Sequence, residues 1–172
     1  MAFNVDSWRG QIKENLPASM YEVAIYGSPV NGRDITIRAE TVTAPGVSWL
    51  SVDNYSPYGN GKMYNIPYRF NPQEITVTHT VDDEGSLLRQ FKDWADKIVD
   101  MPNPKMGALY YKDYVAEMDI YVYNRQGKTA KTYNLEEVFP MTVEPLTLSW
   151  GSHDEIARFA VTYRFTKFKI VG

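Results

Sequence analysis

Alternation of apolar and polar residues near the C-terminus constrains the fold of this chain most. From Arg158 onward every second residue is apolar, in the series Phe159, Val161, Tyr163 and Phe165. A period of two is typical of a half-buried β-strand. At Thr166 the parity flips, and the apolar series continues on even numbers at Phe168 and Ile170. One extra residue in a strand has this effect, so the pattern predicts a β-bulge.

A second strand is expected just before this one, over residues 142–150. Its alternation places Leu146, Leu148 and Trp150 on one parity. Residues 151–154 (Gly-Ser-His-Asp) then provide turn chemistry. Residues 138–170 therefore predict two strands with a tight connection.

The rest of the chain also reads as short strands, with one helix. Alternation predicts strands over residues 20–27, 33–43, 49–52, 74–81, 115–124 and 129–135. Asn31-Gly32 marks a tight turn, so residues 20–43 are expected to form a hairpin. Residues 86–99 repeat apolar side chains at three- and four-residue steps, as in an amphipathic helix. These are Leu87, Leu88, Phe91, Trp94, Ala95 and Ile98.

The expected fold class is mainly β, an antiparallel β-sandwich or barrel of about eight strands with one flanking α-helix (86–99). A helix with a single apolar stripe must cover an edge or an open end of the sheet. A chain of 172 residues without a linker favours one domain, over residues 1–172. Residues 1–19 are expected to be either a short helix capped by Asp6 and ended by Pro17, or an arm that docks on a neighbouring subunit.

Residues 53–69 are dense in Tyr, Gly, Asn and Pro, which predicts a long exposed loop. Its large side chains favour an ordered loop that contacts another subunit; the alternative is a loop folded over its own domain. The contact candidates are Tyr55, Tyr58, Met63, Tyr64 and Tyr68.

A search for reactive groups gives no enzyme motif, so the sequence favours a non-enzyme without cofactor or metal. The net charge of -3 argues against a nucleic-acid-binding surface, and the absence of cysteine excludes thiolate chemistry. His79 and His153 lack zinc-site spacing, and His79 is expected in a core or interface. Glu117 and Asp119 share one strand face, where an acid/base pair is the less favoured interpretation. No window approaches the ~18 apolar residues of a membrane span, and no signal-peptide core is present.

Four short motifs near the C-terminus occur in a definite order. They are Phe139-Pro140, the L-x-L-x-W run at 146–150, Asp154-Glu155-Ile156, and the F-x-V-T run at 159–162. This arrangement resembles the C-terminal signature of the tail tube proteins of contractile-tailed bacteriophages, which are related to the tubes of phage-like contractile injection systems. The resemblance extends back to about Tyr21.

The resemblance implies a structural virion protein, synthesised in the host cytoplasm, that forms stacked hexameric rings around a DNA channel. Strands of neighbouring subunits would join edge to edge, so that a β-barrel lines the channel. Implied partners are the tail sheath, the baseplate or tube initiator, the tape measure protein and the tail terminator. DNA would pass without sequence-specific binding, and no membrane is involved. The alternatives are the inner tube of a contractile injection or secretion system, and a carbohydrate-binding β-sandwich.

If the chain forms a tube, one polar strand row must face the channel. The first candidate row lies on the hairpin 20–43 and comprises Asp34, Thr36, Arg38 and Glu40. The second lies on the strand 115–124 and comprises Glu117, Asp119 and Tyr121. Both rows mix charges and hydroxyls, so a wall of this kind would be wetted without binding phosphate tightly.

Overall fold

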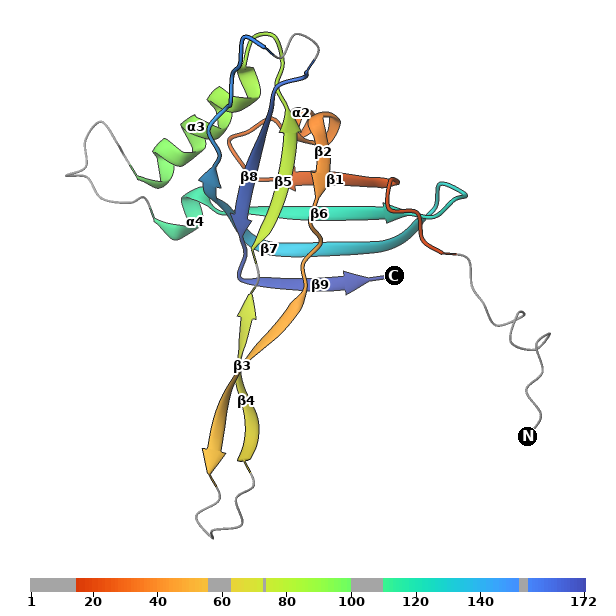
Figure 1. Cartoon of the computed structure of the whole chain (residues 1–172), viewed down its shortest axis with the longest axis vertical. Helices are drawn as coiled ribbons and strands as arrows, with labels where there is room; N and C mark the ends of the chain where they lie inside the picture. The colour runs from red at the N-terminus through yellow and green to blue at the C-terminus, as the bar shows by residue number, and fades with distance from the viewer. Residues whose placement is uncertain (1–14, 56–62, 73, 100–109, 152–154) are drawn as a thin grey trace.

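One seven-stranded antiparallel sheet folded on itself forms the body of the molecule (Figure 1). The computed structural model describes residues 15–55, 63–72, 74–99, 110–151 and 155–172. The first half of the sheet contains β1 (Tyr21–Tyr26), β6 (Ala116–Tyr123), the start of β7 (Thr129–Val143) and β9 (Lys167–Val171). The second half contains the end of β7, β8 (Arg158–Arg164), β5 (Ile75–Thr80) and β2 (Ala39–Val42). The two halves cross each other, which confirms the mainly β, sandwich-like fold.

Two facing corners carry the chain from one half of the sheet to the other. The first is in β7, where Glu137 has a positive φ of 57°, a conformation that is uncommon for a residue with a side chain. The second is the step from β8 to β9 at Phe165 and Thr166, where the Thr166 N–H donates to the Glu136 carbonyl at 3.1 Å. The predicted bulge at Thr166 is therefore wrong. The parity of the apolar residues flips because the chain passes from one half of the sheet to the other.

The core lies between the two halves and is closed by α3 (Ser86–Ile98), in agreement with the predicted helix. Leu87, Phe91 and Trp94 of this helix are completely buried. Phe91 meets the rings of Phe159 and Tyr163 on β8 at centroid distances of 5.9 and 6.2 Å. The Trp94 indole N–H donates to the Tyr114 carbonyl at 2.8 Å, so its polar atom is satisfied inside the core.

The predicted strand 33–43 is wrong over most of its length, because Gly32–Arg38 forms the helix α2. The Asn31 side chain caps this helix by accepting from the Arg33 N–H at 3.2 Å. The Thr36 hydroxyl donates to the Val23 carbonyl at 2.6 Å, so α2 lies along the outer edge of β1. Only Ala39–Val42 continues as a strand, paired with β5 rather than with β1.

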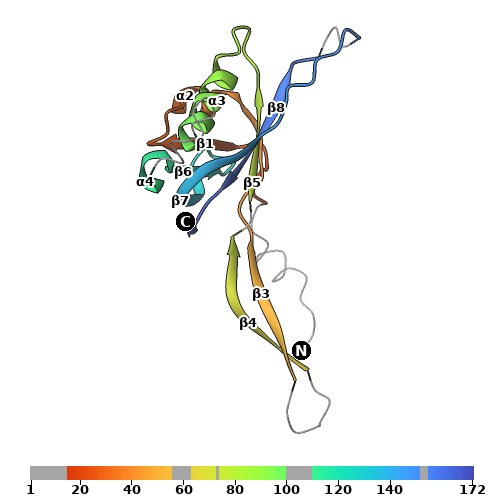
Figure 2. The same ribbon diagram turned by 90° about the vertical axis from the view of Figure 1, so that its left-hand side faces the viewer.

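A long hairpin projects from the body and consists of β3 (Val47–Tyr55) and β4 (Met63–Pro72) (Figures 1 and 2). The prediction of a short strand followed by a loop over residues 53–69 is therefore wrong outside residues 56–62, which lie beyond the described part of the chain. Val52 pairs with Ile66 near its middle. Phe70 anchors its base, 5.9 Å from the Trp49 ring and 6.2 Å from the Phe168 ring of β9.

The predicted strand 142–150 ends at Val143, and the chain then leaves the sheet. Residues 144–149 have no regular structure, and Trp150 is 98% exposed. The Glu144 N–H still donates to the Ala160 carbonyl of β8 at 2.8 Å, but the described structure has no strand pairing beyond it, so alternation alone does not make this stretch a strand. His153 and Asp154 lie outside the described residues, as do Asp6 and the rest of residues 1–14. The short α4 (Tyr111–Tyr114) precedes β6.

The other predicted strands are confirmed. Residues 20–27, 74–81, 115–124 and 129–135 correspond to β1, β5, β6 and the first half of β7. Between β6 and β7 the Asn124 side chain accepts from the Gln126 and Lys128 N–H groups at 2.9 and 3.0 Å. Gly127 takes the positive φ of 74° that this turn requires.

Candidate functional site

The sheet β1–β6–β7–β9 has two unlike faces. Val23, Met118 and Leu135 point into the core and are almost completely buried. The alternate residues point the other way, and we call them the polar face. They are Glu22, Ala24, Tyr26, Glu117, Asp119, Tyr121, Tyr123, Thr132, Asn134, Glu136, Lys167, Lys169 and Val171, of which only Ala24 and Val171 are apolar.

Hydrogen bonds tie the polar face together across its strands. Asp119 is central, because its carboxylate accepts from the Asn134 amide at 2.6 Å and from the Tyr121 hydroxyl at 3.0 Å. The hydroxyls of Tyr121 and Tyr26 are 3.4 Å apart. The hydrogen bond with Tyr26 and then that with Asp119 raise the pKa of Tyr121, which keeps its hydroxyl protonated. These contacts link side chains of β1, β6 and β7 to one another.

The ends of the polar face are bonded in the same way. The Tyr123 hydroxyl donates to Glu22 at 2.6 Å, and the Lys169 ammonium pairs with Glu136 at 2.5 Å. The hydrogen bond from Lys169 lowers the pKa of Glu136, so this carboxylate remains charged. Carboxylates outnumber ammonium groups on the polar face, which makes it weakly acidic. An acidic surface repels phosphate and other carboxylates.

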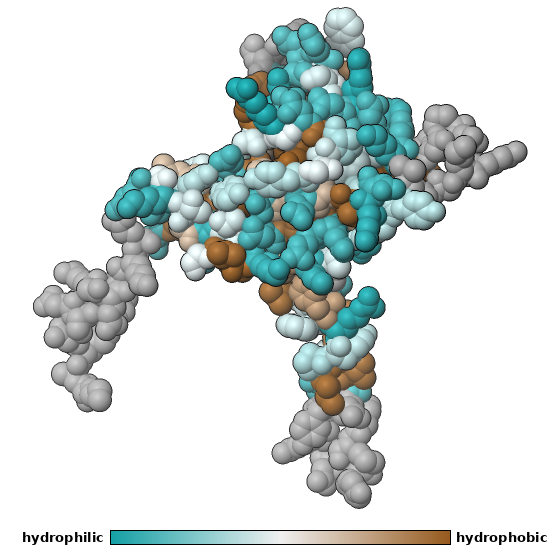
Figure 3. All heavy atoms as spheres, turned by 180° about the vertical axis from the view of Figure 1, so that it is seen from behind, coloured by the Kyte–Doolittle hydropathy of each residue, from teal (hydrophilic) through white to brown (hydrophobic). Residues whose placement is uncertain are grey.

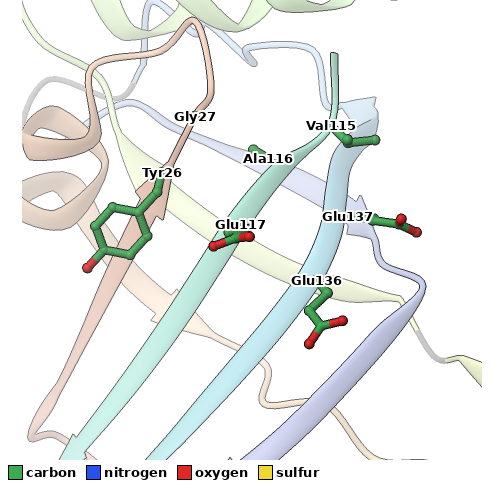
Figure 4. Close-up of a pocket in the computed structure, with 7 residues that line it drawn as sticks. All are labelled: Tyr26, Gly27, Val115, Ala116, Glu117, Glu136 and Glu137. Carbon is green, nitrogen blue, oxygen red and sulfur yellow. The ribbon is translucent and has the colours of Figure 1, made fainter. Parts of the chain in front are cut away.

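Two shallow hollows lie side by side on the polar face. Tyr26, Glu117 and Glu136 stand around the first, which has a volume of about 440 Å³ (Figure 4). The second has a volume of about 310 Å³ and is lined by Asp119, Asn134 and Lys169, with Glu117 and Glu136 shared. Across the described residues no three His, Asp or Glu side chains are grouped to hold a metal ion. The geometry therefore provides a mostly polar surface with two adjoining hollows.

Of the two rows predicted to face the channel, only the second lies on a strand. Glu117 and Asp119 do lie together on one face of β6, with Tyr121 beside them. The first row is not a strand row: Asp34, Thr36 and Arg38 are on α2. Glu40 alone is on a strand, β2, where it pairs with Arg158. Sequence reasoning missed the β7 and β9 members of the polar face, since only strand register brings them beside Asp119.

The β3–β4 hairpin exposes apolar side chains instead (Figure 3). Trp49, Val52, Ile66 and Tyr68 are each about half exposed or more. An isolated two-stranded ribbon is only marginally stable in water, and an apolar surface of this kind usually marks a contact site. Of the predicted contact residues, Tyr55, Met63 and Tyr64 also lie on these strands, whereas Tyr58 is outside the described residues.

The two edges of the sheet β1–β6–β7–β9 also differ. The edge of β1 is covered by α2, through the Thr36–Val23 hydrogen bond and the close approach of Gly32 to the Ile25 carbonyl. Beyond β9 the described residues contain no further strand. An open edge readily accepts another chain. The described helices are also all too short or too polar to cross a bilayer.

A sheet with a polar face, an open edge and a projecting apolar hairpin is typical of a subunit that assembles with other protein chains. The family model described as phage tail tube protein matches residues 4–171. The chain therefore belongs to the phage tail tube protein family.

Solved structures share the fold. The chain is 15% identical to one from the PVC sheath-tube complex of an extracellular contractile injection system in the extended state, with a TM-score of 0.69 and 99% of each chain covered. It is 14% identical to one from the tube-terminating cap of the anti-feeding prophage, with a TM-score of 0.68 and 93% of each chain covered. Comparison with curated proteins gives no match.

Proposed function

We propose that this tail tube protein forms the inner tube of a contractile phage tail or of a related contractile injection particle. Copies join side by side into hexameric rings, and the rings stack into a hollow tube. The observation that carries the proposal is the sheet β1–β6–β7–β9, which is apolar on its core face and mostly polar on the other. A channel wall needs this combination, because it must be wet on one side and packed on the other.

The polar face lines the channel in this proposal, with Glu117 and Asp119 near its centre. Its carboxylates repel the phosphates of passing DNA, so transit meets no sequence-specific or tight binding. The internal hydrogen bonds of the face leave few free donors that could hold a phosphate. By the same repulsion, the wall would let a tape measure protein or another acidic protein pass without tight binding.

Ring closure explains the open edge of β9. A strand edge in an isolated subunit is exposed to aggregation, whereas a closed ring covers every such edge. Residues 53–69, which belong to the β3–β4 hairpin, and the N-terminal segment, residues 1–19, supply further contacts between subunits. The whole chain, residues 1–172, acts as one domain.

The other components follow from the same proposal. The similar solved structures come from a sheath-tube complex, a tube terminator and a particle baseplate, which supports a sheath, a terminator and a baseplate initiator as partners of this chain. The assembled protein belongs to a virion or an extracellular particle after synthesis in the host cytoplasm. Its role is structural, without catalysis or cofactor. The sheath-tube neighbour favours an injection particle as the second candidate.

Electron microscopy of the purified protein tests assembly. Six-fold rings or tubes with a central channel are expected, and a monomer that binds sugar would overturn the proposal. The channel wall is tested separately by labelling, since the chain contains no cysteine. In tubes of Glu117→Cys a maleimide–gold label should lie inside the channel, whereas in the control Lys92→Cys, on the exposed side of α3, it should lie outside. A label on the outer surface in both variants would reverse the orientation of the sheet.

A further inference from the structure

We propose that the groove at the base of the β3–β4 hairpin receives the segment Leu148–Trp150 of a second copy of this chain. The inference rests on the proposed tube and identifies the contact that joins one ring to the next. It comes from an apolar groove at the base of the hairpin, beside β9, and from an exposed apolar segment at the end of the molecule opposite the hairpin.

The groove has a volume of about 390 Å³ and is lined mainly by apolar side chains. Val47 and Trp49 of β3, Phe70 of β4 and Phe168 of β9 form its walls. The rings of Trp49, Phe70 and Phe168 follow one another at 5.9 and 6.2 Å, and Phe168 continues to the buried Phe165 at 5.8 Å. This line of rings reaches the core, so the groove is a fixed feature of the fold. Its volume is sufficient for an indole ring.

The segment that would fill it lies between β7 and β8. Leu148 is 78% exposed and Trp150 98% exposed, although both are large apolar side chains. Residues 144–149 belong to no helix or strand, so they can adapt their backbone to a partner. Tryptophan is the residue most enriched at the centre of protein contacts, which makes Trp150 the natural anchor.

The two surfaces cannot meet within one copy. The hairpin and the segment project from opposite ends of the longest axis of the molecule, as both perpendicular views show (Figures 1 and 2). A contact between two unlike surfaces repeats from copy to copy, and it forms an open stack when the repeat does not close into a ring. Growth along a tube needs a contact of this kind, whereas growth around a ring needs one that closes.

Charge supports the same pairing. Lys167 and Lys169 form the polar border of the groove, and because Lys169 is paired with Glu136, Lys167 is the cation that would meet a second copy. Glu144 and Glu155 flank the apolar segment on either side and are exposed. Opposite charges at the border favour this partner and orientation over others. A lysine beside the groove also suits an indole ring, whose face attracts cations.

Cysteine cross-linking tests the contact directly, because every disulfide must involve an introduced residue. The variant carries Val47→Cys in the groove and Ser149→Cys beside Trp150, which itself is retained. Oxidation of assembled tubes should give a ladder of covalent oligomers. Mixed tubes of the two single variants should give dimers only. The control pairs Val47→Cys with Tyr110→Cys, another highly exposed aromatic position, and should give no ladder.

Variants of the interacting groups complete the test. Trp150→Ala should reduce tube length at least tenfold while rings remain, whereas the control Tyr110→Ala should leave the tubes unchanged. Lys167→Glu and Glu155→Lys should each shorten the tubes, and the double variant should restore them. Normal tubes of Trp150→Ala without a cross-link ladder would overturn this inference and leave the proposed function standing. Absence of both rings and tubes in the unmodified protein would overturn the proposed function itself.

Discussion

At the scale of single residues, the most unusual group is His79. Its imidazole is completely buried, 5.5 Å from the ring centroids of both Phe91 and Phe159, and neither ring nitrogen has a hydrogen-bond partner. Burial lowers the pKa of His79 from 6.5 to about 4, so the ring is neutral at pH 7. The sequence predicted its inward position but not the lack of partners.

His79 should therefore make the protein sensitive to acid. The unfolded chain binds this proton below pH 6.5 and the folded chain only below about pH 4, so stability is lost as the pH falls through that window. The loss between pH 7 and pH 4 should be about 3 kcal/mol. Urea unfolding of the wild type and of His79→Leu at both pH values measures it. Carboxylates such as Asp82 titrate in both proteins, so an equal loss in the variant would contradict this assignment.

Gly32 is the second residue whose identity the structure requires. A Cβ atom at this position would lie 2.8 Å from the Ile25 carbonyl oxygen of β1. Gly32→Ala should therefore push α2 away from the edge of β1 and destabilise the protein by ~1–3 kcal/mol. Gly151→Ala is the control, because its nearest neighbour is a serine side-chain oxygen at 3.8 Å. Equal melting temperatures for the two variants would show that α2 adjusts freely.

At the scale of elements, α3 is the piece that the sequence predicted best, because its apolar stripe is both regular and buried. Its N-terminus is also fixed by local chemistry. The Asp82 carboxylate accepts from the Ser86 hydroxyl at 2.5 Å and from the Ser86 and Leu87 N–H groups at 3.1 and 3.5 Å. These bonds lower the pKa of Asp82 to about 2. An acidic residue at this place is also favourable because a helix N-terminus carries a partial positive charge.

Trp94 should carry much of the stability that α3 contributes. Trp94→Ala removes a completely buried ring and leaves the Tyr114 carbonyl without its donor, so a loss of roughly 3–5 kcal/mol is expected. Chemical denaturation followed by circular dichroism measures it. Lys92→Ala, on the exposed side of the same helix, should change the stability by less than ~0.5 kcal/mol. A loss that small in Trp94→Ala would mean that this face is not core.

Two predicted strands are wrong for physical reasons that the alternation of apolar and polar residues cannot reveal. Residues 33–38 alternate like a strand, but the Asn31 cap and the bond from Thr36 to Val23 stabilise a helix over β1. Residues 144–150 alternate equally well, yet in the described structure they form no strand pairing beyond the bond from Glu144 to Ala160. Within the candidate site, the shared face of Glu117 and Asp119 can be predicted from one strand alone. The positions of Asn134 and Lys169 beside them depend on how β6, β7 and β9 pair, which the sequence pattern does not give.

At the scale of the whole molecule, the proposed tube makes the polar face the surface that decides what its channel can hold. Its carboxylates exceed its ammonium groups, and many side chains are bonded to one another. Repetition around a ring and along a tube multiplies the effect of each charge. A single substitution on this face is therefore expected to have a large effect on cargo and a small effect on folding.

Glu117→Lys should make assembled tubes retain DNA, because each ring then presents additional cations to the channel. Retention should fall steeply as salt rises, as expected when bound counterions are released. Asp93→Lys makes the same change of charge on the exposed side of α3 and should retain none in the channel. Nuclease protection of DNA in purified tubes measures both. Equal protection in the two variants would place Glu117 outside the channel.

The two corners at Glu137 and Thr166 also determine how the subunit responds to mechanical load. Because β7 and the β8–β9 segment each run through both halves of the sheet, the halves are joined by peptide bonds as well as by packed side chains. A pull on the polar half reaches the other half along these two backbones, and the Thr166–Glu136 hydrogen bond ties them together where they turn. The two halves of the sheet therefore cannot slide past each other without breaking these connections. A tube built from this subunit should resist axial compression and transmit force along its length.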